Sequence, residues 1–274
     1  MLTVKDLRIE FFDHSLPEVA VTDVDFTLKE GEILGIVGES GSGKSLTAQA
    51  IAGLMKRKDA KVSGEIMFDG VNLLNSPRSV LRSFQGSKIG FVFQEPLSSL
   101  NPVVKVGWQV EDALRVHEKM TKEEMKQKAL KALEDVSLDD PERIYNSYPH
   151  ELSGGQRQRV MIAGAMIDRP KLLIADEPTT ALDVTVQAQI ITLLQKINKK
   201  YNTAILFISH DLSLVRKLCG SVLVMSDGFV VESGPCDEIF TNPKEEYTKK
   251  LIDSIPKVPD WKTRSTWERI TDTK

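Results

Sequence analysis

Cysteine is scarce in this sequence, which contains only Cys219 and Cys236 among its 274 residues. The pair lacks the short spacing of a zinc site, and two thiolates cannot hold an iron–sulfur cluster, which needs four. We therefore expect neither a metal cluster nor a structural zinc ion. So few cysteines, placed far apart, also fit a reducing compartment and a plain packing role.

Long apolar segments and a surplus of positive charge are also missing. No run approaches the roughly 18 apolar residues of a membrane-spanning helix, and residues 1–12 do not have the layout of a signal peptide. Lys and Arg number 36 against 39 Asp and Glu, so the net charge of −3 argues against a general surface for nucleic acid. The hydrophobic share of 41% still allows a full core, in one large domain or a core with a subdomain.

A glycine-rich segment with a lysine, GESGSGKS at residues 38–45, matches the pattern G-x-x-x-x-G-K-[ST]. It follows an apolar strand at residues 33–37 and precedes an expected helix at residues 46–55, which is the required order. Backbone N–H groups of such a loop surround phosphates, while the lysine and the last serine reach the phosphates and Mg²⁺. A simple glycine-rich turn is the alternative, and the flanking elements disfavour it. The expected nucleotide contacts are Gly38, Glu39, Ser40, Gly41, Ser42, Gly43, Lys44, Ser45 and Leu46.

The pentapeptide LSGGQ at residues 152–156 is rare enough that chance explains it poorly. Its structural interpretation is a helix start, with Ser153 as the N-cap and Gln156 completing a capping box. A functional interpretation fits the same residues. A capped helix start behind Gly154 and Gly155 leaves backbone N–H groups and the positive end of the helix dipole open to a phosphate.

Two adjacent carboxylates follow an apolar run at residues 172–175, which is typical of a strand buried on both faces of a parallel sheet. Asp176, at the strand tip, can hold Mg²⁺ through water, and Glu177 can accept a proton from water that attacks a phosphate. Another buried strand, residues 203–209, leads to His210. A lone histidine there is more often a cap or a satisfied polar residue, but the neighbouring motifs favour a catalytic role.

The hydrophobic pattern changes twice along the chain. Residues 24–28 and 66–68 alternate apolar and polar side chains, as half-buried antiparallel strands do. Residues 101–149 carry helical patterns, including a capping box that starts at Thr121, and predict a helical subdomain; an insertion without a mechanical role is the alternative. Strands and helices then alternate again, with Asp183 as the expected N-cap of a long helix.

In this order, the motifs make residues 2–256 similar to the ATPase subunits of ATP-binding cassette (ABC) transporters. The resemblance implies an α/β fold, namely a P-loop NTPase (RecA-like) core with an antiparallel β subdomain and an inserted helical subdomain. The core with its antiparallel part is expected at residues 1–100 and 160–235. The helical subdomain with LSGGQ is expected at 101–159, and a C-terminal helical extension and polar tail at 236–274.

The resemblance also assigns catalytic roles. It implies that Glu177 is the catalytic base and that Gln94 and His210 are switch residues that position the γ phosphate and the attacking water. It further implies that Ser45, Gln94 and Asp176 hold Mg²⁺. All of these positions carry the residue types of the family.

Contacts to the base and to a second subunit are implied as well. An aromatic residue near the end of the first strand stacks on adenine in this family; Phe11 or Phe12 fits, and Phe11 is our assignment. The LSGGQ motif faces away from the phosphate loop of its own chain, so its residues act on ATP held by another subunit. The remaining nucleotide contacts are then Ser153, Gly154, Gly155, Gln156 and Asp183.

Three longer segments resemble the oligopeptide, dipeptide and nickel importer subfamily: FQEPLSSLNP at residues 93–102, YPHELSGGQRQRV at 148–160 and ALDVTVQAQI at 181–190. Residues 38–51 resemble one of its two paralogous ATPase types. The departure is at the tail, because many members continue into a cysteine-rich segment that this chain lacks. The polar residues 257–274 contain two tryptophans that can dock on the body of the protein or on a partner.

We therefore expect an ATPase that uses ATP and Mg²⁺ to power peptide import and that binds peripherally to the cytoplasmic face of the membrane. The expected partners are two transmembrane permease subunits, a second ATPase subunit (a paralogue or another copy), and indirectly an extracytoplasmic substrate-binding protein, but no nucleic acid. Import of nickel or a chelated metal is the nearest alternative. The others are a soluble cassette ATPase acting on nucleic acid or ribosomes, and a regulatory module that does not hydrolyse ATP.

Overall fold

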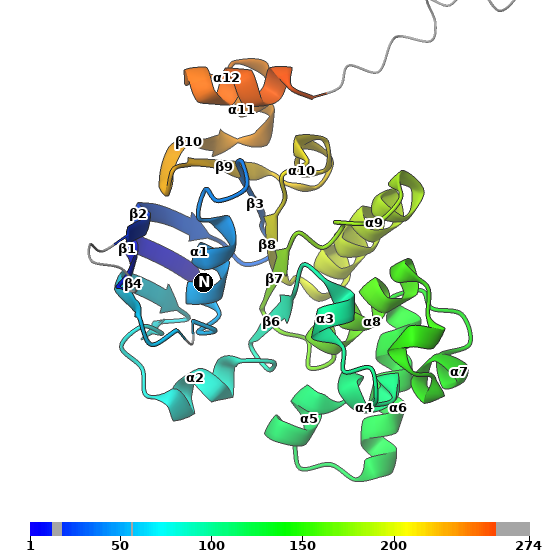
Figure 1. Cartoon of the computed structure of the whole chain (residues 1–274). Coiled ribbons are helices and arrows are strands. Elements are labelled where there is room, and N and C mark those ends of the chain that lie inside the picture. The colour runs from blue at the N-terminus through cyan, green and yellow to red at the C-terminus, as the bar shows by residue number, and fades with distance from the viewer. Residues whose placement is uncertain (13–17, 56, 256–274) are drawn as a thin grey trace, which may run out of the picture.

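A computed structural model describes residues 1–12, 18–55 and 57–255 of the chain. These residues form two β-sheets with helices beside and between them, and most helices of the middle of the chain gather on one side (Figure 1). The tail at residues 257–274, with its two tryptophans, lies outside the described residues.

The smaller sheet is antiparallel and has the strand order β2-β1-β4-β5. Val24, Phe26 and Leu28 of β2 are buried, whereas the residues between them are exposed. The alternation expected from the sequence is therefore present, and one face of this sheet packs inward. Its strands are β1 (Leu2–Phe11), β2 (Glu18–Leu28), β4 (Ala60–Phe68) and β5 (Val71–Asn72).

The larger sheet has the order β10-β9-β3-β8-β7-β6, and all of its pairs are parallel except β9 with β10. Every residue of β7 and β8 is buried. Ile208 of β8 pairs with both Ile36 and Asp176, so the loops that follow β3, β7 and β8 leave the sheet at one edge. The strands are β3 (Ile33–Val37), β6 (Ile89–Val92), β7 (Leu172–Asp176), β8 (Ala204–Ile208), β9 (Ser221–Ser226) and β10 (Phe229–Pro235).

Helix α1 lies between the two sheets, and α3 to α8 form the insertion between β6 and β7 (Figure 1). A membrane-spanning segment is not found among the helices of the described residues. The helices are α1 (Lys44–Ile51), α2 (Arg78–Phe84), α3 (Pro96–Ser99), α4 (Val106–Val110), α5 (Asp112–His117), α6 (Lys122–Asp135), α7 (Pro141–Asn146), the 3₁₀ helix Pro149–Glu151, α8 (Gly154–Met166), α9 (Val184–Tyr201), α10 (Leu212–Leu218), α11 (Cys236–Thr241) and α12 (Glu246–Asp253).

The predicted helix caps are confirmed. Thr121 and Glu124 form a reciprocal capping box at the start of α6, and Ser153 and Gln156 do the same at α8. At the start of α9 the Asp183 carboxylate accepts a backbone N–H at 2.9 Å. Each cap satisfies N–H groups that have no partner within the helix.

The helix after the glycine-rich loop is shorter than predicted. We expected residues 46–55, whereas α1 spans Lys44–Ile51. It begins earlier because Gly43, with φ of +94°, turns the chain directly into the helix. It ends earlier because Gly53 adopts a left-handed conformation with φ of +65°, which is typical of a residue that follows a helix.

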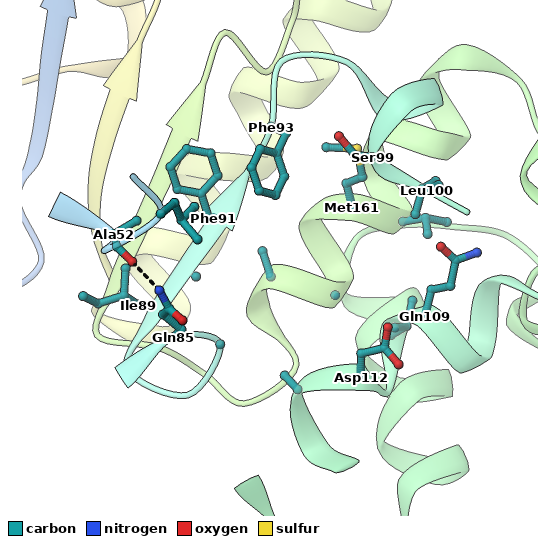
Figure 2. A pocket seen from close by; sticks show the side chains of 18 residues that line it. Ala52, Gln85, Ile89, Phe91, Phe93, Ser99, Leu100, Gln109, Asp112 and Met161 are labelled. Carbon is teal, nitrogen blue, oxygen red and sulfur yellow. Dashed lines mark hydrogen bonds between the residues drawn. The ribbon is translucent and has the colours of Figure 1, made fainter. Parts of the chain in front are cut away.

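Helices α4 to α8 pack around an apolar core that continues into the central sheet. Helix α8 passes through residue 159 without a break, so the subdomain boundary that we drew there falls inside a helix; the division into subdomains stays a prediction. Between these helices and β6 lies a groove of about 340 Å³. Figure 2 shows Phe91 and Phe93 on one side of the groove, opposite Met161 and Ser99.

The contact between β6 and α8 gives a test of this packing. A Cβ atom on Gly90 would lie 2.3 Å from the backbone oxygen of Ala165, so Gly90→Ala must separate strand and helix. We expect this variant to lower the free energy of unfolding by about 1 to 3 kcal/mol in chemical denaturation. Gly220→Ala is the matched control, because a Cβ atom on Gly220 meets nothing within 4 Å. Equal stabilities of the two variants would contradict the packing described here.

Candidate active site

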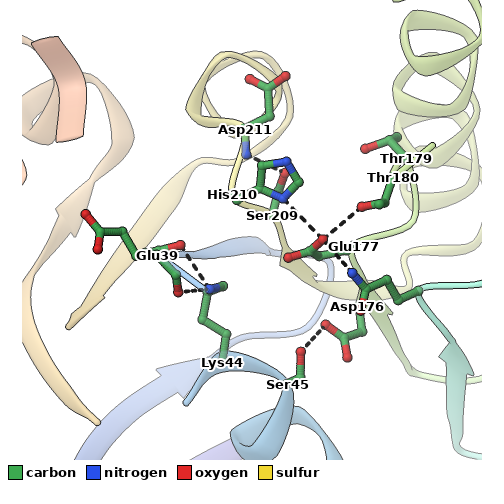
Figure 3. Close-up of polar contacts among 12 residues, drawn as sticks. Glu39, Lys44, Ser45, Asp176, Glu177, Thr179, Thr180, Ser209, His210 and Asp211 are labelled. Atoms are coloured by element: carbon green, nitrogen blue, oxygen red, sulfur yellow. Dashed lines mark hydrogen bonds and ion pairs between the residues drawn. The ribbon is translucent and has the colours of Figure 1, made fainter. Parts of the chain in front are cut away.

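The phosphate loop, residues 38–45, connects β3 to α1 and holds a buried lysine. The Nζ atom of Lys44 donates to the backbone oxygens of Gly38 at 2.9 Å and Glu39 at 2.6 Å (Figure 3). Burial lowers the pKa of the Lys44 ammonium, and the nearby carboxylate of Glu177 opposes that shift. The lysine is held at the base of the loop by carbonyl oxygens, and phosphate oxygens are acceptors of the same kind for its N–H groups.

The loop borders a cavity of about 170 Å³. Gly41 has φ of +86°, and a Cβ atom there would meet nothing within 4 Å, so its backbone is open to a ligand. At Gly43 a Cβ atom would lie 3.0 Å from the backbone oxygen of Ala20, so this position requires glycine. The cavity is lined by Ser40, Gly41, Gly43, Lys44, Ser45, Leu46, Gln94 and Glu177.

A carboxylate and a hydroxyl meet below the loop. The Ser45 hydroxyl donates to Oδ1 of Asp176 at 2.8 Å (Figure 3). Asp176 is 5% exposed, and burial raises the pKa of its carboxyl group, although the Ser45 hydrogen bond acts in the opposite direction. Oxygen donors of this kind suit Mg²⁺, which takes one or two carboxylates together with phosphate oxygens.

The described residues contain no group of three or more His, Cys, Asp or Glu side chains that could hold a metal ion. A cation at Ser45 and Asp176 therefore needs further oxygen ligands from the substrate phosphates. This donor set fits Mg²⁺ bound together with ATP rather than a permanent metal centre.

Glu177 is the centre of a second polar cluster. Its Oε2 accepts a hydrogen bond from Gln94 Nε2 at 2.9 Å and one from the Thr180 hydroxyl at 2.8 Å. Nδ1 of His210 lies 3.1 Å from the same oxygen. Figure 3 shows His210 and Thr180 pointing toward Glu177, with Lys44 across the site. The structure thus brings together the three residues predicted to be catalytic.

The backbone at Glu177 explains how this side chain reaches the site. Its φ of +45° is in the left-handed region, which residues other than glycine rarely adopt. The N–H of Glu177 donates to the backbone oxygen of Ile208 at 3.0 Å, which fixes this turn against β8. Asp176 is the last residue of β7, and this turn directs the next residue, Glu177, into the cavity.

Thr180 is the contact that the sequence analysis missed. It lies three residues after Glu177, in a turn closed by its own N–H to the backbone oxygen of Glu177 at 3.2 Å. The spacing from the carboxylate was the available signal. It was not distinctive, because Thr179 and Thr180 are adjacent and a threonine in a turn more often bonds to the backbone.

The LSGGQ motif lies outside this cavity. Ser153 is exposed at the start of α8, and the motif contributes no residue to the described lining of the phosphate-loop cavity. A Cβ atom on Gly155 would lie 2.8 Å from a methyl group of Val186, and one on Gly154 would lie 3.6 Å from Leu182. The start of α8 is thus packed closely against the start of α9 and the segment that precedes it.

The aromatic residues at the end of β1 have different surroundings. Phe11 is 7% exposed, and the guanidinium of Arg57 lies 4.3 Å from the centre of its ring. Phe12, the next residue, is 50% exposed. The guanidinium of Arg57 thus occupies one side of the Phe11 ring, whereas Phe12 is accessible, and the assignment of Phe11 stays a prediction.

Comparisons with known proteins show which family the chain belongs to. The ABC transporter family model matches residues 21–180, and the model for the oligopeptide/dipeptide transporter C-terminal region matches residues 231–274. The segment in which we expected a departure from the subfamily thus carries a match to its C-terminal region. Residues 231–274 contain a single cysteine, Cys236, so the cysteine-rich segment of many members is still lacking from this sequence.

Curated relatives cover nearly the whole chain. The oligopeptide transport ATP-binding protein OppD of Bacillus subtilis is 48% identical over 93% of this chain and 72% of its own length. OppD of Escherichia coli is 46% identical, over 94% of this chain and 76% of that protein. The peptidoglycan transport ATP-binding protein YejF of Agrobacterium fabrum is 48% identical, and the chain spans 47% of its length.

Solved structures show the same fold. The dimeric ATP-binding cassette MJ0796, bound to ADP and Pi after hydrolysis, matches with a TM-score of 0.77 and 32% identity, over 86% of this chain and 99% of that one. CbiO1 of Clostridium perfringens matches with a TM-score of 0.74 and 31% identity, over 88% and 90%. The predicted P-loop NTPase fold is confirmed, and the chain belongs to the ABC transporter family as an ATP-hydrolysing subunit.

Proposed function

We propose that this protein hydrolyses ATP to power the import of peptides, as the energy-coupling subunit of a transporter at the cytoplasmic face of the membrane. The observation that carries the cargo assignment is the match of residues 231–274 to the oligopeptide/dipeptide transporter C-terminal region. The names of the relatives from Bacillus subtilis and Escherichia coli support the same assignment. Import of nickel or a chelated metal, and action on nucleic acid or ribosomes, have no comparable support.

ATP binding uses the phosphate loop. Backbone N–H groups of the loop and the Lys44 ammonium are the phosphate ligands. Lys44 replaces its contacts with the Glu39 carbonyl and the Ser42 hydroxyl by phosphate oxygens and keeps its contact with the Gly38 carbonyl. Ser45, Asp176 and Gln94 hold Mg²⁺, which neutralises charge on the phosphates when it is bound. Burial of the Asp176 carboxylate disfavours its negative charge, so a bound cation stabilises it by supplying a counter-charge.

Glu177 acts as the general base. Its carboxylate takes a proton from water as the water oxygen bonds to the γ phosphorus and the bond to the β–γ bridging oxygen breaks, which yields ADP and phosphate. The hydrogen bonds from Gln94 and Thr180 and the contact with His210 fix the orientation of that carboxylate. Positioning of this kind is the main contribution of a protein to phosphoryl transfer.

A second ATPase subunit completes each site. Ser153 and Gly155 of one chain contact the γ phosphate held by the other; the exposure of Ser153 and the place of the motif outside the described lining of its own cavity support this role. Val184, at the start of α9, is 81% exposed beside the motif and is available to such an interface. The facing subunit is a paralogue or a second copy of this chain.

The groove between β6 and α8 is the proposed docking place of a permease subunit. Apolar side chains form much of its surface, and Trp108, on the adjoining helix α4, is 55% exposed. The Gln94 loop leaves the active site and continues along this groove through Ser99 and Leu100. A permease segment bound there is in direct contact with the residues that follow the catalytic cluster.

Isolation of the assembly tests the proposed function. The full chain, extracted from membranes in mild detergent, should be recovered with two permease-like chains and a second cassette ATPase, as identified by mass spectrometry. The assembly in lipid vesicles, with its binding protein, should hydrolyse ATP faster when peptide is present. Stimulation by nickel but not by peptide, or recovery only with ribosomes or DNA, would contradict the assignment.

Replacement of the base gives a direct test of the site. Glu177→Gln removes the proton acceptor, but the oxygen of the new amide can still accept from Gln94 and Thr180. ATP binding should therefore be retained while hydrolysis falls about 100-fold or more. Phosphate release and equilibrium ATP binding are the two measurements. Lys44→Ala is the contrasting variant and should lose binding itself. Near wild-type turnover of Glu177→Gln would show that Glu177 is not the base.

Thr180 provides a second test, specific to orientation of the carboxylate. Thr180→Val removes one of the donors to this carboxylate and leaves the others, and we expect kcat to fall by about 3- to 10-fold, in line with the net contribution of one typical hydrogen bond. KM for ATP should change little, because Thr180 does not line the phosphate-loop cavity. Thr192→Val, which removes only a hydroxyl bonded to the backbone of α9, is the matched control. A change confined to KM would refute the positioning role.

A further inference from the structure

A hydrogen bond joins the phosphate loop to the C-terminal part of the chain. The backbone N–H of Glu39 donates to the hydroxyl oxygen of Tyr247 at 3.1 Å, across 208 positions in the sequence. Tyr247 is the second residue of α12, and its side chain is partly buried. None of the sequence motifs pointed to this residue.

The bonded peptide group is also held from its other side. The N–H of Glu39 and the carbonyl of Gly38 belong to one peptide unit, and that carbonyl oxygen accepts from Lys44 Nζ at 2.9 Å. The Tyr247 hydroxyl and the Lys44 ammonium therefore fix one planar group from opposite ends. Rotation of this unit would turn its carbonyl away from Lys44.

The tyrosine is anchored independently of the loop. The carboxylate of Glu232, on β10, accepts the backbone N–H groups of Lys244 at 2.8 Å and Glu245 at 3.2 Å, just before α12. Glu232 is 9% exposed, so this cap is a buried one. Tyr247 and Leu251 of α12 pack against the main hydrophobic core. The position of the hydroxyl is thus set by β10 and the core.

The other hydrogen bonds of Glu39 come from within the loop itself: its carbonyl oxygen accepts from Lys44 Nζ at 2.6 Å and from the Ser42 N–H at 3.2 Å. Gly38 fits only without a side chain, because a Cβ atom would lie 2.1 Å from the backbone oxygen of Met225. Glu39, Ser40 and Gly41 are exposed, and Gly41 has no neighbour within 4 Å of a built Cβ atom. A loop of this composition loses much conformational entropy when it closes around a ligand, unless another group orders it beforehand.

We propose that Tyr247 is a positioning residue for the phosphate loop. It orders the Gly38–Glu39 peptide in the free protein, so that Lys44 and the loop N–H groups are preset for the phosphates of ATP. One role of the C-terminal region is therefore to set ATP affinity. This inference rests on the proposed role of residues 38–45 in binding ATP.

Tyr247→Phe tests the proposal, because it removes the hydroxyl and keeps the packed ring. We expect the Kd of the full chain for ATP with Mg²⁺, measured by calorimetry, to rise by about 3- to 10-fold, the effect of one lost hydrogen bond. Hydrogen exchange of the Glu39 amide in the free protein should become faster by a similar factor. kcat of the assembly should stay close to that of the wild type, because Glu177 keeps its partners.

Two further variants separate positioning from general destabilisation. Tyr201→Phe is the matched control: it removes a phenolic hydroxyl that bonds to Asp135, and it should leave both the Kd and Glu39 exchange unchanged. Glu232→Ala releases the start of α12 and should raise the Kd in the same direction as Tyr247→Phe. Together the two substitutions should do little more than either one, because they act through one contact.

The outcomes distinguish this proposal from the proposed function. An unchanged Kd and unchanged Glu39 exchange in Tyr247→Phe would overturn the role of Tyr247, and so would an equal loss in Tyr201→Phe. Failure of the wild-type chain to bind ATP, or retention of binding by Lys44→Ala, would instead contradict the assignment of residues 38–45. Weaker ATP binding together with faster Glu39 exchange in Tyr247→Phe, but not in Tyr201→Phe, would support the role of Tyr247.

Discussion

The site depends on one constraint, which is that the central parallel sheet is buried on both faces. No residue of β7 or β8 is exposed, so polar groups can be placed only where the strands end. Because β3, β7 and β8 are parallel and in register, their ends bring the phosphate loop, both carboxylates and His210 to one edge. Residues far apart in the sequence meet there as a consequence of strand pairing.

Burial of a charged side chain at this edge lowers the stability of the fold unless the charge has hydrogen-bond or ion-pair partners. Lys44 bonds to loop carbonyls, Asp176 to the Ser45 hydroxyl, and Glu177 to Gln94 and Thr180. Binding of ATP therefore replaces one set of partners by another and does not remove bare charges from water. Burial disfavours the charged forms of both Lys44 and Asp176, so a ligand that carries negative phosphates together with a cation supplies each with a counter-charge.

What the sequence predicted was largely local. Strands, caps and the glycine-rich loop depend on neighbouring residues, so the sequence alone predicts Thr121, Ser153 and Asp183 as caps, and the structure has them there. Contacts between distant segments were not accessible in this way. Thr180 needed the turn at Glu177, and Tyr247 needed the packing of α12 on the core. The predicted end of α1 was wrong because the apolar pattern continues to residue 55, whereas the left-handed conformation of Gly53 does not allow the helix to continue.

The close packing at Gly155 limits which sequences this fold can accept. A side chain at this position would collide with Val186, and Val186 belongs to the first turn of α9. A larger residue at 155 is therefore tolerated only together with a smaller one at 186, so the two positions are expected to vary together among related proteins. The second glycine of LSGGQ is thus constrained by the packing of its own chain as well as by its proposed contact with the nucleotide of another, and a loss of activity on its replacement has two separable physical origins.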